Sequence, residues 1–304
     1  MAIGVQVVIV CGKIARYKMV GRFIAWGYIL TLTADDLKTE YLKLLDEEHN
    51  EQVYQKYLEQ HTRLIPREFV QNHGIGCDLV LRKLSFGSDY KSDFFYFSKS
   101  SDDWNAVHIE IEKPSSKYFK GSTSEFDPGF LHAIQQINDW RAWFARDNQK
   151  GFLNSLAAIQ VPTHMAIRNP TFNKYVLVYG RRDEYSGSDI RRSKIQSLET
   201  DDFKIISFDS LAEGLKSKDE LSIAIRHNEY IDIVTDEITN SDMYGWIDPT
   251  QFRVSATLHD KLKNGPPSRT YRGFKNGVPI EAHQYAAENI RIRRDKDVVE
   301  GAEA

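Results

Sequence analysis

The chain contains little cysteine and no cysteine cluster. Its 304 residues include two cysteines, Cys11 and Cys77, and neither lies in a CxxC motif or beside a second metal-binding side chain. A disulfide framework and a structural zinc site therefore have no support. We expect a reducing, cytoplasmic environment for a chain of this composition.

The chain also lacks an excess of one charge. It has 40 Lys and Arg against 43 Asp and Glu, a formal net charge of −3, with 41% hydrophobic and 12% aromatic residues. This composition excludes a polycation and a disordered chain, and it is sufficient for a sizeable core. Contact with nucleic acid would have to come from local basic patches.

Long apolar runs and nucleotide-binding loops are missing as well. The apolar runs 1–11 and 23–34 are each about 12 residues long, whereas a helix needs about 20 to span a bilayer. We expect them to form buried strands or an oligomer contact, with no membrane partner. No GxGxxG, GxxxxGK[ST], GxSxG or HExxH motif occurs, so no nucleotide cofactor is implied.

The hydrophobic pattern predicts a mixed α/β fold of three parts. These are an N-terminal segment (1–40), a central domain (41–225) and a C-terminal extension (226–304). Helical periodicity is seen after residues 33, 50 and 127, and strand-like runs cover 77–81, 93–97 and 107–111. From residue 175 strands alternate with helices, which indicates a mixed sheet flanked by helices.

The most informative segment is 107–114, VHIEIEKP. Side chains alternate across a strand, so Val107, Ile109 and Ile111 should enter the core while the other face carries His108, Glu110 and Glu112. The two carboxylates would lie about 7 Å apart, a distance that a divalent cation can bridge. An ordinary amphipathic strand with its acidic face in water is the simpler alternative.

An upstream aromatic strand favours the metal hypothesis. Asp93 opens the run 93–97, 17 residues before Glu110, so a hairpin could place the two acids side by side. Converging carboxylates repel each other unless a cation offsets their charge. Asp78 is a rival for this position, but its spacing fits a hairpin less well.

Four segments in order resemble the Shedu-type nuclease domain of bacterial antiphage defence, a branch of the PD-(D/E)XK restriction-endonuclease-like superfamily. They are the helix 51–59, the strand start Asp93-Phe94, the motif 109–114 and the helix 132–141. The strand 175–182 and the segment 208–211 also look like this family. The resemblance covers about 45–220 and implies a restriction-endonuclease-like core that assembles into a dimer or tetramer.

The resemblance assigns roles to individual residues. Asp93 and Glu110 match the superfamily's metal-binding acids, and Glu112 stands where the superfamily usually has its catalytic lysine. Glu112 could act as a ligand or base, while Lys113 or Lys117 could restore the positive charge. Glu51 matches a further acid that points toward the metal in some members. Gln136 matches a glutamine that could hold the substrate phosphate or the water, although a buried structural amide is nearly as plausible.

Several basic residues are candidates for contact with a nucleic-acid backbone. They follow the motif or lie near the end of a strand and on the next helix: Lys117, Arg181, Arg182, Arg191 and Arg192. Solvated surface charge is the alternative for all of them. His108 and His132 are weaker candidates for phosphate contact.

These features together predict a cytoplasmic, homo-oligomeric DNA endonuclease that depends on Mg²⁺ or Mn²⁺ and acts in antiphage defence. Two alternatives remain: a nuclease-fold module that binds DNA but has lost catalysis, and a metal-dependent nuclease acting on RNA. The absence of a lysine at position 112 motivates the first alternative.

Overall fold

The computed structural model describes residues 6–10, 13–17, 32–88, 90–265, 271–275 and 278–294. The chain forms two units, 1–37 and 38–304. The first unit contains an antiparallel pair, β1 (Gln6–Val10) and β2 (Lys13–Tyr17). The first predicted apolar run includes β1, whereas most of the second run lies outside the described residues.

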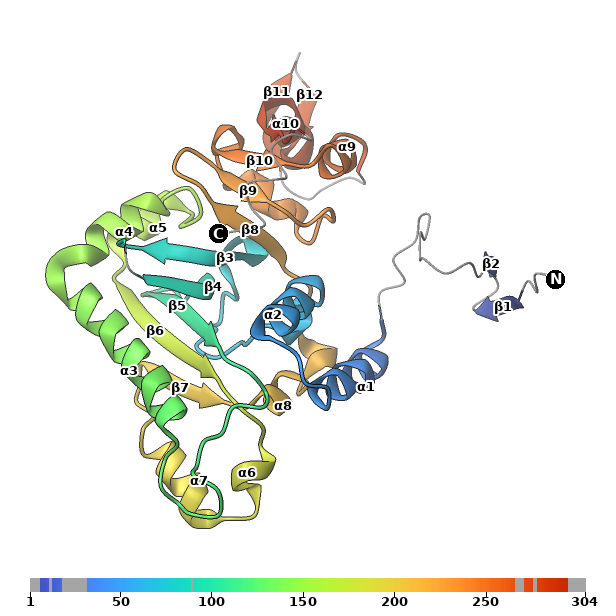
Figure 1. The fold of residues 1–304 in the computed structure, drawn as a ribbon. Helices are drawn as coiled ribbons and strands as arrows, with labels where there is room; N and C mark the ends of the chain where they lie inside the picture. Colours follow the sequence, from blue (N-terminus) through green and yellow to red (C-terminus); the bar gives the residue numbers. More distant parts are fainter. Residues whose placement is uncertain are drawn as a thin grey trace. The chain divides into compact units, whose positions relative to one another are not determined.

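The second unit is built on one mixed sheet of nine strands (Figure 1). In spatial order the strands are β13 (Arg291–Ile292), β10 (Phe252–Val254), β9 (Ile231–Ile233), β8 (Ser222–Arg226), β3 (Leu79–Phe86), β4 (Tyr90–Lys99), β5 (Trp104–Ile111), β6 (Thr171–Val178) and β7 (Phe203–Ile206). The antiparallel pairs are β3–β4, β4–β5 and β8–β9, and the other neighbours are parallel. The predicted mixed α/β fold is confirmed.

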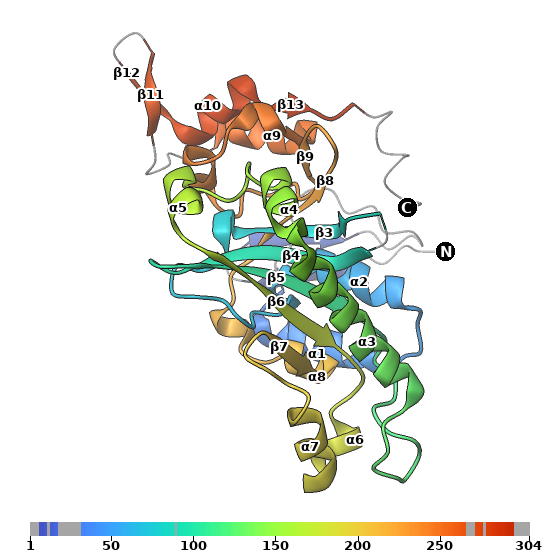
Figure 2. The ribbon, with the colours of Figure 1, turned by 90° about the vertical axis from the view of Figure 1, so that its left-hand side faces the viewer.

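Helices cover both faces of this sheet. Figure 2 shows α3 crossing one face, with α2 and α8 behind the sheet. The helices are α1 (Ala34–Leu45), α2 (Glu51–Gln60), α3 (Pro128–Trp143), α4 (Gln149–Ser155), α5 (Thr163–Arg168), α6 (Asp183–Ser186), α7 (Asp189–Gln196), α8 (Phe208–Leu211), α9 (Ala256–Asn264) and α10 (Ala282–Asn289). A small antiparallel pair, β11 (Tyr271–Lys275) and β12 (Val278–Glu281), precedes α10. Within the described residues, no helix is both long and apolar enough to cross a bilayer.

The sequence of α3 explains where this helix begins and which face is buried. Asp127 caps its N-terminus by accepting a hydrogen bond from Gly129 N, and Pro128 fills the first turn. The buried side chains recur every three or four residues and pack on the sheet: Phe130, Ala133, Ile137 and Trp140. Strand β5 is buried on both faces through Ile109, because α3 lies over the face that carries His108 and Glu110.

The C-terminal extension continues the main sheet. Three of its strands, β9, β10 and β13, pair in sequence beyond β8. Their apolar side chains join the core formed with α9 and α10, among them Ile231, Ile233, Phe252 and Val254. By alternation, Asp232 and Arg253 point to the opposite face of these strands.

Two substitutions on α3 test this packing. Ile137 is fully buried and Leu131 is 49% exposed, so the same helix offers a matched pair. We expect Ile137→Ala to lower the free energy of unfolding by about 2–5 kcal/mol, through lost burial and the cavity left behind. Leu131→Ala should change it by less than about 0.5 kcal/mol in the same urea titration. Equal losses in both variants would contradict this orientation of α3.

Candidate functional site

The register of β4 and β5 places Asp93 beside Glu110. Phe94 pairs with Ile109 across the two antiparallel strands, so one further step sets Asp93 opposite Glu110. Side chains opposite each other in an antiparallel pair share one face of the sheet. The two acids nominated from a 17-residue spacing therefore lie together at the end of β5.

Asp93 is buried, with 3% of its surface exposed, and both carboxylate oxygens have partners. Its Oδ1 accepts a short hydrogen bond from Lys83 Nζ on β3. Its Oδ2 accepts one from the backbone amide of Ile111 at 2.8 Å. Lys83 Nζ also lies 3.9 Å from Glu51 Oε1, at the start of α2. The lysine thus links two of the candidate acids.

Lys83 has a backbone conformation that side chains rarely adopt. Its φ is +48°, in the left-handed region, which costs roughly 1–2 kcal/mol for a residue other than glycine. Leu81 and Leu84 on either side both belong to the hydrophobic core, so the alternation of β3 shifts by one residue at Lys83. This local kink accompanies the contact between the Lys83 amine and Asp93. Strain of this kind is concentrated at functional sites.

Glu110 is the most strongly perturbed acid of the group. Burial, followed by the neighbouring charge of Asp93, raises the pKa of Glu110 well above its ordinary value. Gln136 on α3 donates a hydrogen bond from Nε2 to Glu110 Oε1 at 2.6 Å. Glu110 Oε2 is buried and has no hydrogen-bond partner among the described residues. A buried carboxylate oxygen without a partner is costly, so this oxygen is suited to bind a cation or to accept a hydrogen bond from a donor.

Two further acids lie at the margin of this group. Burial, and then the charge of Asp93, raises the pKa of Glu51 and of Glu112. Lys113 and His132 oppose the shift in the pKa of Glu112. Glu112 is half-buried and follows β5 directly, with its backbone amide bonded to Val178 O at 3.0 Å. The electrostatic coupling among Glu51, Asp93, Glu110 and Glu112 shows that the structure brings these four acids into one neighbourhood.

The donor chemistry fits a hard cation in part. In the described part of the chain, no three His, Cys, Asp or Glu side chains are arranged to hold a metal ion. Mg²⁺ needs fewer protein ligands, because it keeps several waters and binds through one or two carboxylates together with substrate phosphate. Asp93 and Glu110 can supply such a pair, and the residues that the structure describes leave Glu110 Oε2 available to a cation.

His108 belongs to the core and does not line this site. It is fully buried, and its ring lies 4.9–6.3 Å from those of Phe86, Phe95, Trp140, Phe144, Phe152 and Tyr175. Burial lowers the pKa of His108 to about 3, so the ring is neutral at physiological pH. Its Nε2 lies 3.4 Å from Asn173 Oδ1. The alternative of a solvated face for β5 is therefore wrong at His108.

Three of the nominated basic residues form internal ion pairs. Lys117 Nζ lies 2.8 Å from Glu184 Oε1, and Arg182 lies 2.6 Å from Glu213. Arg181 is bonded at 3.0 Å to the two carboxylates of Asp46 and Asp209, which are 163 residues apart in the chain. These pairs join distant segments, so their charges are offset before any ligand binds.

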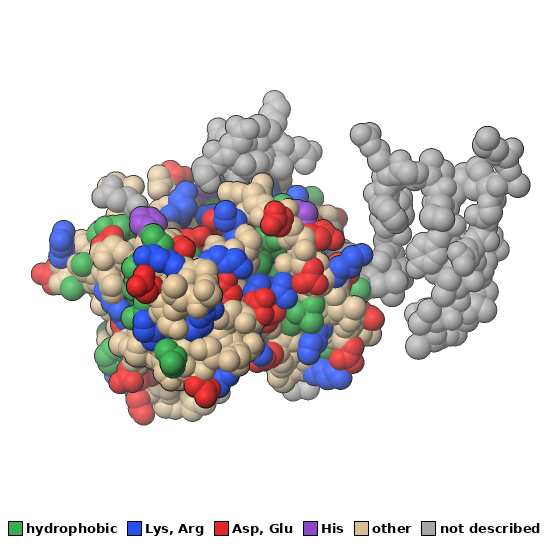
Figure 3. Space-filling view, turned by 60° about the horizontal axis from the view of Figure 1, so that its bottom comes forward, with side chains coloured by type: hydrophobic (Ala, Val, Ile, Leu, Met, Phe, Trp, Pro, Cys, Tyr) green, Lys and Arg blue, Asp and Glu red, His purple; other side chains and the backbone are tan. Residues whose placement is uncertain are grey.

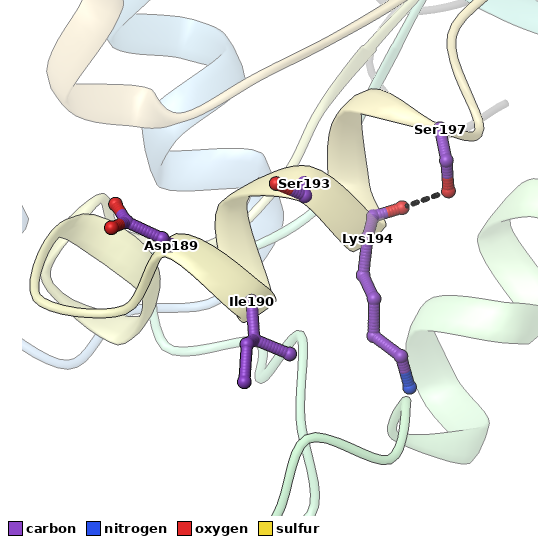
Figure 4. Close-up of a pocket in the computed structure, with 5 residues that line it drawn as sticks. All are labelled: Asp189, Ile190, Ser193, Lys194 and Ser197. Atoms are coloured by element: carbon purple, nitrogen blue, oxygen red, sulfur yellow. Dashed lines mark hydrogen bonds between the residues drawn. The ribbon is translucent and has the colours of Figure 1, made fainter.

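The basic residues of α7 also have internal partners. Arg191 donates to the carbonyls of Gly121 and Glu184, and Arg192 donates to Asp189 and Ser186 O. A shallow hollow of about 410 Å³ on this helix is lined by Asp189, Ile190, Ser193, Lys194 and Ser197. In Figure 4 the Lys194 side chain extends from the helix toward the neighbouring loop. Lys194 Nζ bonds Ser124 O at 2.6 Å. Figure 3 shows acidic and basic side chains interspersed over the face in view.

Sequence reasoning missed Lys83. The strand was expected to end at Leu81, whereas β3 continues to Phe86. The signal in the sequence that could have identified it is a lysine within the otherwise largely apolar run LVLRKLSF. Asp78, the rival acid, bonds Asn240 instead and is not among the groups that perturb Glu110.

One comparison with known proteins identifies the family. The model of the C-terminal region of the Shedu protein SduA matches residues 48–212, which include α2, the β3–β5 sheet core, α3 and the four neighbouring acids Glu51, Asp93, Glu110 and Glu112. No curated protein matches the chain. The match covers more than half of the chain and agrees with the four ordered segments of the sequence, so the chain belongs to the Shedu family, whose members act in antiphage defence.

Proposed function

We propose that this protein is a metal-dependent DNA endonuclease of antiphage defence, with a PD-(D/E)XK-like site at the end of β5. The observation that carries the proposal is the buried Glu110 carboxylate beside Asp93, whose Oε2 has no hydrogen-bond partner within the described part of the chain. Strongly perturbed acids and a strained residue at one position are typical of catalytic sites.

Each residue then has a separate task. Asp93 and Glu110 would hold Mg²⁺ or Mn²⁺, and Gln136 orients Glu110 through its bond to Oε1. Lys83 supplies a positive charge beside Asp93, where a scissile phosphate would gain negative charge in the transition state. The positive charge of Lys83 on β3 would thus replace the lysine that the resemblance leads one to expect at position 112, where this chain has a glutamate.

Glu112 is suited to accept a proton from the attacking water. The pKa of Glu112 is raised toward neutral pH. A general base is most effective when its pKa lies near the working pH. The metal, when bound, would polarise the phosphate and lower the pKa of a coordinated water. Glu51 lies across Lys83 from Asp93 and would help to keep the lysine in place.

Removal of either central carboxylate tests the nuclease proposal. Asp93→Asn and Glu110→Gln are expected to lower cleavage of linear and circular DNA in Mg²⁺ or Mn²⁺ by at least about 100-fold, because the metal would lose a ligand. Asp102→Asn, at an exposed position between β4 and β5, is the matched control and should retain activity. If the wild-type protein binds DNA but leaves it intact, the protein is a binding module. If it cleaves RNA and not DNA, its substrate is RNA.

The role of Lys83 is tested independently of the carboxylates. Lys83→Met should reduce the cleavage rate by roughly 100-fold or more through loss of transition-state stabilisation. DNA binding measured in EDTA should stay close to that of the wild type. Lys91→Met, an exposed lysine on β4, is the control. Unchanged cleavage by the Lys83 variant would show that its contact with Asp93 is purely structural.

The raised pKa of Glu110 predicts a pH dependence of stability in metal-free buffer. In the interval between its unfolded and folded pKa values, the folded state binds more protons, so stability increases as pH falls through that interval. Glu110→Gln should therefore raise the melting temperature at pH 7–8 and flatten its pH profile. Mg²⁺ or Mn²⁺ should stabilise the wild-type protein and not this variant. If the metal raises the melting temperature of both proteins equally, Glu110 is not a metal ligand.

A further inference from the structure

A pocket with a polar lining lies beside the break between α3 and α4. Its volume is about 370 Å³. This is near the lower end of the range for ligand-binding pockets, so the pocket suits one small planar group. The residues that line it come from the end of β3 and from the region where α3 gives way to α4: Ser85, Phe86, Gly87, Trp143, Asp147, Asn148, Gly151, Phe152 and Ser155. No step of the proposed nuclease mechanism uses them.

Unusual backbone conformations shape this pocket. A π-helical turn at Phe144–Asn148 interrupts the helical chain, and Asp147 within it has a left-handed φ of +63°. Gly87 is also left-handed, with a φ of +67°, and a Cβ at this position would lie only 2.8 Å from Trp143 Nε1. The turn after β3 therefore needs a glycine in order to pack against the indole. Such turns and strained residues are frequent at functional sites.

The side chains of the pocket suit a nucleobase better than a phosphate. Among the described residues that line it none is basic, and the carboxylate of Asp147 would repel an anion. Trp143 supplies a partly exposed indole, on which a flat base can stack. Asn148 Nδ2 donates to Trp143 O at 2.7 Å, which leaves Oδ1 of this amide as a second acceptor. These acceptors match the exocyclic amino group of cytosine, adenine or guanine, which thymine lacks.

Two elements connect the pocket to the candidate catalytic site. On β3, Ser85 lies two residues beyond Lys83, a distance of about 7 Å along a strand. On α3, Trp143 lies seven residues beyond Gln136, which is about 10 Å along a helix, and Gln136 bonds Glu110. A stacked strand of DNA rises by about 3.4 Å per nucleotide, so these distances correspond to about two or three nucleotides.

We infer that this pocket binds one unstacked base of the DNA, within about three nucleotides of the phosphate that the candidate site cuts. The inference rests on the proposed nuclease function. Enzymes that act on nucleic acid can rotate a single base out of the stack and hold it between aromatic and polar side chains. Stacking on Trp143 supplies affinity for any base, and the two acceptors favour a base with an amino group. A free nucleotide carries the same base chemistry and is the alternative source.

A variant that fills the pocket tests this inference. Gly151 lines the pocket on α4, and a Cβ at this position meets no atom within 4 Å. Gly151→Leu therefore introduces a side chain into the pocket, and it also raises the helix propensity of α4. Gly187→Leu is the matched control, because Gly187 is exposed, has equally open space at its Cβ position and lies outside the pocket. Both variants should melt at the wild-type temperature or above it.

The measurement is binding to three short single strands of equal length, in EDTA so that no cleavage occurs. The strands are built from deoxycytidine, from thymidine or from baseless sugar-phosphate units, so all three carry the same number of phosphates. The wild type and Gly187→Leu should bind the deoxycytidine strand at least about 10-fold more tightly than the baseless strand, with the thymidine strand between them. Gly151→Leu should lose most of this difference and keep its affinity for the baseless strand.

The outcomes separate this inference from the nuclease proposal. If Gly151→Leu discriminates among the strands as the wild type does, or if the wild type binds all three equally, the pocket holds no base of the DNA and the inference is wrong. Metal-dependent cleavage that is lost in Asp93→Asn and Glu110→Gln would still support the nuclease proposal. If the wild type neither binds nor cleaves DNA, both proposals fail.

Free deoxycytidine monophosphate distinguishes the two sources of the base. If it raises the melting temperature of the wild type and not of Gly151→Leu, while the three strands bind equally, the pocket serves a free nucleotide and the assignment to DNA is wrong. If the strands differ as expected and the free nucleotide causes no shift, the base comes from the DNA.

Discussion

The buried carboxylate of Asp93 is the constraint on which the candidate site depends. A carboxylate with 3% exposure must be paired or bonded, because an isolated charge in the interior is very costly. The amide of Ile111 meets one oxygen, and Lys83, which has a left-handed backbone conformation, meets the other. The register of β3, β4 and β5 and the kink in β3 are thus linked to the carboxylate of Asp93.

Much of this arrangement follows from local sequence rules. Alternating hydrophobicity and a 17-residue spacing were sufficient to pair Asp93 with Glu110, because a short hairpin fixes its own register. Lys83 could not be found in this way, since a positive φ at a lysine has no signature in a single sequence. The partners of Arg181 were equally hidden, because Asp46 lies 135 residues away and meets it only after tertiary folding.

Burial on both faces accounts for the main differences from expectation. A solvated acidic face was the simpler alternative for β5, yet α3 covers this face and His108 becomes a neutral member of an aromatic core. On the same face Glu110 accepts a hydrogen bond from Gln136 of α3. Alternation therefore located the acids correctly but did not show that a helix encloses them.

The position of the positive charge matters more than the motif that usually supplies it. In space, a catalytic cation must lie within a few ångströms of the metal-binding acids and the phosphate, and several strands can deliver it there. Here position 112 carries a glutamate while Lys83, on the second strand from β5, contacts Asp93. Under the proposed nuclease function, Lys83 would supply the charge that the resemblance assigns to a lysine at position 112, so Glu112 is weak support for a loss of catalysis.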